Sequence, residues 1–181
     1  MSAMPDVVTH RYDPARSMGH NLSSLPDHGA SRVLDGLRRE SRPTLKPDYL
    51  ARRRITEQWL SQAASEALLR SFHNPPTYFF LGDFSHLADL SRPASLVLPL
   101  SDLPSDGITF TLGDSMSVAA ERAPRLYKLR EMIEIFADGE AVRGFGFSDK
   151  CGFQARFIEI QLWLELSRVP TRAFALSNEE N

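Results

Sequence analysis

Residues 152–166 read Gly-Phe-Gln-Ala-Arg-Phe-Ile-Glu-Ile-Gln-Leu-Trp-Leu-Glu-Leu, with an aliphatic side chain at every second position from Ile158 to Leu166. Side chains of a β-strand point alternately to opposite faces of its sheet. The pattern therefore predicts a long strand with one apolar face. The other face carries Phe157, Glu159, Gln161, Trp163 and Glu165. Aromatic rings beside a carboxylate and an amide indicate that this second face is covered as well.

The composition is that of a globular protein with one domain. The chain has 181 residues, of which 42% are hydrophobic and 24% are charged, enough for one hydrophobic core. The net charge of -2 predicts no bulk attraction to nucleic acid or to a membrane surface, and it leaves nucleic-acid binding by a local patch open. The single Cys151 excludes an internal disulfide. Without an apolar leader or a membrane-length apolar run, we expect a cytoplasmic protein.

The first half of the chain has helical patterns. Residues 1–21 are polar, contain proline and glycine, and are expected to be irregular. Ser24 can begin a first helix, and Asp48 can cap the strongest helix of the chain. The apolar stripe of this second helix is expected to run from Ile55 to Leu68.

The second half is rich in strands. The strand candidates are residues 77–81, 95–100 and 108–112, separated by turn sequences. Asp114 or Ser115 is expected to cap a short helix, and apolar spacing predicts another helix over residues 126–136. Helices followed by strands favour an α+β fold, with a helical layer packed on a mostly antiparallel sheet. We expect one globular domain over residues 22–170 and a polar tail over residues 171–181.

The expected core combines the helical stripes with the apolar faces of the strands. It comprises Leu50, Ile55, Trp59, Ala63, Leu68, Phe79, Leu81, Leu96, Leu98, Ile108, Phe110, Ile133, Phe136, Ile158, Ile160 and Leu162.

Common catalytic and metal-binding motifs are missing from the sequence. The five histidines have no partner at metal-ligand spacing, so no metal is expected. The sequence has no phosphate-binding glycine loop, no Gly-x-Ser-x-Gly motif and no kinase motif. Residues 52–54 are three consecutive arginines near a helix start, where the helix dipole does not favour cations. They are either a solvated face or an anion site.

Four short segments, at residues 21–29, 78–79, 110–115 and 154–157, form an ordered set. The first reads Asn-Leu-Ser-Ser-Leu-Pro-Asp-His-Gly, the second Tyr-Phe, the third Phe-Thr-Leu-Gly-Asp-Ser and the fourth Gln-Ala-Arg-Phe. Taken in order, they resemble the DarT-like ADP-ribosyltransferases, which modify bases in single-stranded DNA. The resemblance implies an ADP-ribosyltransferase-like fold and the use of NAD.

The resemblance also implies a catalytic carboxylate. The family's catalytic glutamate falls on Arg156, which is cationic and offers no hydrogen-bond acceptor. Either the register is displaced, or the fold is kept without this chemistry, or the resemblance is accidental. Glu159 lies three residues further on, on the opposite strand face to Arg156. We take Glu159 as the candidate catalytic residue and Gln161 as its hydrogen-bonding neighbour; the non-catalytic interpretation is a half-exposed strand residue paired with an arginine.

The same resemblance implies a set of NAD-binding residues. His20 and Asn21 would contact the nicotinamide end, and His10 is the alternative histidine. Arg52 or Arg53 could hold the pyrophosphate through bidentate hydrogen bonds.

Two other classes of function stay open. A non-catalytic binding, regulatory or immunity-type protein would use the aromatic side chains as interface anchors, so a protein partner is the alternative to a nucleotide. A small-molecule binder is the third class. The sequence predicts no membrane association and leaves the oligomeric state open.

Overall fold

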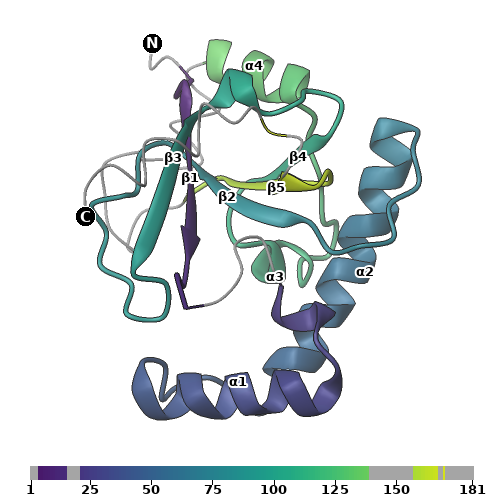
Figure 1. Cartoon of the computed structure of the whole chain (residues 1–181). Helices are drawn as coiled ribbons and strands as arrows, with labels where there is room; N and C mark the ends of the chain where they lie inside the picture. Colours follow the sequence, from purple (N-terminus) through teal and green to yellow (C-terminus); the bar gives the residue numbers. More distant parts are fainter. Residues whose placement is uncertain (1–3, 16–20, 139–156, 167–168, 170–181) are drawn as a thin grey trace.

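The computed structural model describes residues 4–15, 21–138, 157–166 and 169. These residues form an α+β fold around a five-stranded antiparallel sheet (Figure 1). The strands are β1 (Val7–Tyr12), β2 (Thr77–Leu81), β3 (Ala94–Pro99), β4 (Ile108–Thr111) and β5 (Glu159–Leu162). Their order across the sheet is β3-β1-β2-β5-β4, so β5 is paired on both of its edges.

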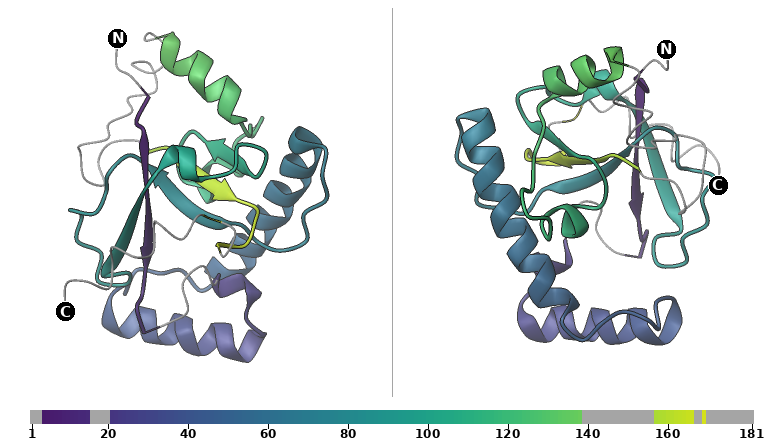
Figure 2. Two further views of the ribbon diagram at one scale, coloured as in Figure 1. Left: turned by 45° about the horizontal axis from the view of Figure 1, so that its top comes forward. Right: turned by 180° about the vertical axis from the view of Figure 1, so that it is seen from behind.

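The helices contribute two covering layers. They are α1 (Asp27–Glu40), α2 (Tyr49–Leu68), α3 (Ser115–Val118) and α4 (Leu129–Ala137), with short 3₁₀ helices η1 (Leu22–Ser24) and η2 (Leu100–Asp102). Figure 2 shows α4 and α2 on different sides of the sheet, with α1 crossing the end of α2. Both faces of the sheet therefore have a helix to bury them.

Alternation along β2 and β5 separates two hydrophobic clusters. Phe79 and Ile160 are paired across the strands and point into the larger cluster, which also holds Met132 and Phe136 of α4. The smaller cluster holds Leu60 and Ala64 of α2 with Phe72 and Trp163, and Tyr78 packs against it. The expected apolar face of the last strand is confirmed, since Ile158, Ile160 and Leu162 are each at most 1% exposed. On its second face Glu159, Gln161 and Trp163 are buried, as predicted, whereas Glu165 is exposed.

One error concerns the N-terminus. The segment expected to be irregular contains β1, which pairs with both β2 and β3. The polar residues of β1 gave no sign of burial in the sequence. In the fold, Arg11 and the Nδ1 atom of buried His10 donate to backbone carbonyl groups from other segments. The β-branched residues Val7, Val8 and Thr9 were the available signal.

Other corrections concern length and facing. The last strand covers only Glu159–Leu162 among the described residues, and residues 152–156 lie outside them. Ile55 is 66% exposed and Ile133 is 54% exposed, so both were wrongly assigned to the core. The buried side of α2 instead carries Thr56, Glu57, Leu60 and Ala64. On this side Glu57 accepts from Arg53 and from Tyr78 of β2, so the buried side of α2 is partly polar.

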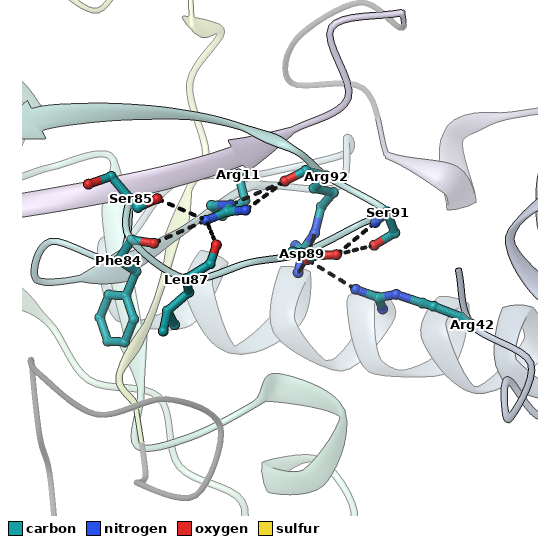
Figure 3. Close-up of polar contacts among 8 residues, drawn as sticks. All are labelled: Arg11, Arg42, Phe84, Ser85, Leu87, Asp89, Ser91 and Arg92. Atoms are coloured by element: carbon teal, nitrogen blue, oxygen red, sulfur yellow. Dashed lines mark hydrogen bonds and ion pairs between the residues drawn. The ribbon is translucent and has the colours of Figure 1, made fainter. Parts of the chain in front are cut away.

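Arg11 organises the loop between β2 and β3 (Figure 3). Its side chain is buried and donates hydrogen bonds to the carbonyl oxygens of Phe84, Ser85, Leu87 and Arg92. In the same loop, the Asp89 carboxylate accepts from Arg92 and from Arg42, which follows α1. One strand side chain thus fixes the loop, and one loop carboxylate ties it to the helical layer.

Candidate functional site

Glu159 opens β5 on the sheet face that α2 covers. It lies between Phe80 of β2 and Thr111 of β4, and it is 5% exposed. A buried ionised carboxylate needs hydrogen bonds or a cation close by. Both are supplied by residues from separate elements.

Gln161 supplies the hydrogen bond from the same strand face. Its Nε2 donates to Glu159 Oε1 at 3.3 Å and to Thr111 Oγ1 at 3.0 Å. Its Oε1 accepts a hydrogen bond from Thr109 Oγ1 at 3.1 Å. Trp163 Nε1 in turn donates to Thr109 Oγ1 at 2.8 Å. The pairing of Glu159 with Gln161 that the alternating sequence predicted is thus present, with partners from β4.

Arg53 of α2 supplies the cation. Its Nε donates to Glu57 Oε1 at 2.8 Å, and its guanidinium lies 4.0 Å from the centroid of the Tyr78 ring. The Tyr78 hydroxyl donates to the same Glu57 oxygen at 3.4 Å. The side chains of Arg53 and Glu57 are 14% and 6% exposed. Arg53 is therefore held in place by an ion pair and a ring contact.

The charges of Arg53 and Glu159 act on each other. Burial raises the pKa of Glu159 to about 7, while the charge of Arg53 acts in the opposite direction. Burial would lower the pKa of Arg53, but Tyr78, Glu159 and Glu57 outweigh it, so the net change is upward. An electrostatic interaction between Arg53 and Glu159 thus links α2 to β5.

The N-terminus of α3 completes the surroundings of Glu159. Asp114 caps α3 by accepting from the backbone N–H groups of Met116 and Ser117, as the sequence predicted. Its charge raises the pKa of Glu159, and the Ser115 hydroxyl acts to lower it. Ser115 is fully buried, and its hydroxyl makes no hydrogen bond of good geometry.

The other described residues that the sequence assigned to the site do not gather around Glu159. Asn21 Nδ2 donates to the Pro76 carbonyl oxygen, immediately before β2, at 2.6 Å. Arg52 is exposed, one residue before Arg53 on α2. His20 and Arg156 lie outside the described residues. Glu159 and Gln161 are thus hydrogen-bonded, and Arg53 acts on Glu159 through its charge. Asn21 instead lies beside the start of β2, where Thr77 pairs with Leu162 and not with Glu159.

His10, the alternative histidine, does not face Glu159. Its Nδ1 donates to the Tyr78 carbonyl oxygen at 2.8 Å, and its ring lies 5.2 Å from that of Phe79, which belongs to the larger hydrophobic cluster. Burial lowers the pKa of His10. The His10 ring is thus part of the opposite face of the sheet.

Sequence reasoning missed Glu57, Thr109 and Ser115. Glu57 follows Arg53 by four residues, which is the spacing of an ion pair on one helix face. Thr109 and Thr111 alternate with apolar residues along β4, as Glu159 and Gln161 do along β5. The alternation of polar with apolar residues in both strands could have predicted that β4 and β5 share a polar patch.

Among the described residues, no three His, Cys, Asp or Glu side chains form a group that could bind a metal ion. The helices in this part of the chain are all too short or too polar to cross a bilayer.

Protein-family models, curated proteins and solved structures yield no match to this chain. The contacts of Glu159 and the sequence resemblance are therefore the basis on which a function can be assigned.

Proposed function

We propose that this chain is an ADP-ribosyltransferase-like protein that uses NAD, with Glu159 as the reactive carboxylate. The observation that carries the proposal is the buried cluster of Glu159, Gln161 and Arg53. Burying an ionised carboxylate costs free energy, and buried carboxylates with a raised pKa are common at functional sites. Here Gln161 of β5 supplies a hydrogen-bond donor to it, and Arg53 of α2 supplies a nearby positive charge.

The chemistry requires a carboxylate beside a ribose. In ADP-ribose transfer the bond between the ribose C1′ and nicotinamide breaks, and its electron pair leaves with the nicotinamide nitrogen. A nucleophile bonds to C1′ and releases its proton. The carboxylate of Glu159 stabilises the positive charge that develops on the sugar. Gln161 donates to Oε1, and we assign Oε2 to the substrate.

The two arginines then have different roles. Arg53 is bonded to Glu57 and stacked on Tyr78, so we assign it to holding Glu159 in place. Arg52 is exposed, so its guanidinium is available for the pyrophosphate. Asn21 would contact the nicotinamide end from its position beside Pro76.

Nicotinamide release by the purified chain tests this assignment. We expect the chain to release nicotinamide from NAD, with water or a single-stranded oligonucleotide as acceptor. Glu159→Gln should lower the rate about 100-fold or more, because it removes the charge that stabilises the developing cation. Glu165→Gln is the matched control, since Glu165 is exposed beyond the end of β5. This control should keep the full rate.

The pH profile gives an independent measurement. The reactive form is the carboxylate, and the pKa of Glu159 is raised to about 7. The rate should therefore fall as the pH decreases through about 7 and level off above it. Absence of NAD binding by calorimetry, together with absence of nicotinamide release, would contradict the proposal and favour a non-catalytic binding protein.

A further inference from the structure

The polar groups on the α2-facing side of the sheet form a chain with a defined direction. The indole N–H of Trp163 donates to Thr109 Oγ1, and the Thr109 hydroxyl donates to Gln161 Oε1. On the other side of the amide, Gln161 Nε2 donates to Thr111 Oγ1 and to Glu159 Oε1. The Thr111 hydroxyl donates onward to the Gly113 carbonyl oxygen at 3.0 Å. All these donors and acceptors belong to buried residues except Gly113.

The direction follows from which groups can only donate. An indole N–H has no acceptor capacity, whereas a threonine hydroxyl has one hydrogen and two lone pairs. Because Thr109 accepts from Trp163, its hydrogen is free for the Gln161 oxygen. With its oxygen bonded to Thr109, the Gln161 amide must turn its N–H groups towards Glu159. In the flipped orientation the amide oxygen would face the carboxylate, and the Thr109 hydrogen would lose its acceptor.

We propose that Thr109 and Trp163 are positioning residues, which hold the Gln161 amide as a hydrogen-bond donor to Glu159 and thereby favour its carboxylate form. This inference rests on the proposed function for its catalytic meaning. Neither residue is assigned to substrate contact. Trp163 also packs against Phe72 at a tilt of 35°, with ring centroids 5.0 Å apart, so the smaller hydrophobic cluster orients its indole.

Other charges act on Glu159 from each neighbouring element. Arg53 of α2 lowers its pKa, and Asp114 at the start of α3 raises it. Glu57 is bonded to Arg53, and the Tyr78 hydroxyl of β2 is bonded to Glu57. None of these groups contacts Thr109 or Trp163 through a hydrogen bond that the structure shows. Substitutions at Thr109 and Trp163 therefore change the amide orientation and leave the charges in place.

The test is a carboxyl NMR titration of Glu159 in the full chain, which requires no NAD. Thr109→Val keeps the volume of the side chain and removes the hydroxyl. Thr109→Ser keeps the hydroxyl and is the matched control. Trp163→Phe keeps an aromatic ring in the cluster and removes the N–H. Glu159→Gln identifies the Glu159 resonance.

We expect Thr109→Val to raise the pKa of Glu159 by about 0.5 to 1, the equivalent of one hydrogen bond of ordinary net strength. Trp163→Phe should raise it in the same direction, since the freed Thr109 oxygen can then accept from a flipped amide. Thr109→Ser should match the wild type. If NAD is consumed, the acidic limb of the rate profile should move with the measured pKa.

Two results would overturn the inference. One is an unchanged or lower pKa of Glu159 in Thr109→Val; the other is an equal rise in Thr109→Ser. If Thr109→Val does not fold, the comparison of Trp163→Phe with Thr109→Ser decides in the same way. A rise in the pKa of Glu159 in Thr109→Val without any NAD turnover would support the positioning role of Thr109 and Trp163 and contradict the proposed function. Failure of the inference and failure of the proposed function therefore give different results.

Discussion

Replacing Glu159 by glutamine should stabilise the fold at neutral and higher pH. Its pKa is raised from 4.5 to about 7, with burial as the largest cause. This pKa difference lowers the free energy of unfolding at neutral pH by about 3 kcal/mol, because each pKa unit corresponds to about 1.4 kcal/mol. The side chain is 5% exposed, so solvent screening reduces the value little. Glutamine has nearly the same shape and can still accept from Gln161.

The stability difference between Glu159→Gln and the wild type depends on pH, because the folded and unfolded chains bind the Glu159 proton with different pKa values. Below pH 4.5 the carboxyl is protonated in both states, and the wild type and Glu159→Gln should be similarly stable. Between pH 4.5 and about 7 the unfolded chain loses the proton while the folded chain keeps it. The free energy of unfolding of the wild type therefore falls through this window, and the fall is complete above about pH 7. The advantage of Glu159→Gln should grow by about 3 kcal/mol over the same window.

Urea denaturation at pH 4, 6 and 8 measures this advantage directly. Ile160→Val is the control, since it alters the adjacent buried residue without an ionisable group. It should lower the free energy of unfolding by about 0.5–1.5 kcal/mol at every pH. A constant difference between Glu159→Gln and the wild type would refute the reasoning. If Glu159→Gln is less stable than the wild type at pH 8, the attraction between Arg53 and the Glu159 carboxylate outweighs the free-energy cost of burying its charge.

Two further substitutions test the fold. Leu162→Ala should lower the free energy of unfolding by about 2–5 kcal/mol, because the side chain is 1% exposed; a change near zero in urea would show that the facing of β5 is wrong. Arg11→Met should lower stability by about 2 kcal/mol or more, since several buried carbonyl groups lose their donor. It should also speed proteolysis between β2 and β3, whereas equal cleavage rates would contradict the role of Arg11 in that loop.

Local patterns carried much of the fold. The strand at Thr77–Leu81 coincides with the sequence prediction, and Asp114 caps the short helix as expected. The apolar side of β5 was predictable because alternation along a strand is a local property. The facing of α2 was not, since Ile55 fits the apolar stripe of an isolated helix. Glu57 lies on the buried side, where it accepts from Tyr78 of β2, a partner from a separate segment of the sequence.

The candidate site divides in the same way. Alternation alone put Glu159 and Gln161 on one covered strand face, and the run of arginines marked Arg53 as a residue of interest. The partners of Glu159 come from segments separated by up to about a hundred residues of chain, which no local pattern connects. β1 is similar: its buried polar residues are tolerable only beside carbonyl groups from distant segments. The sequence by itself therefore determined which faces are apolar, because side-chain direction follows from backbone period. Tertiary structure decided which polar groups meet, because burial is tolerated only where distant partners satisfy them.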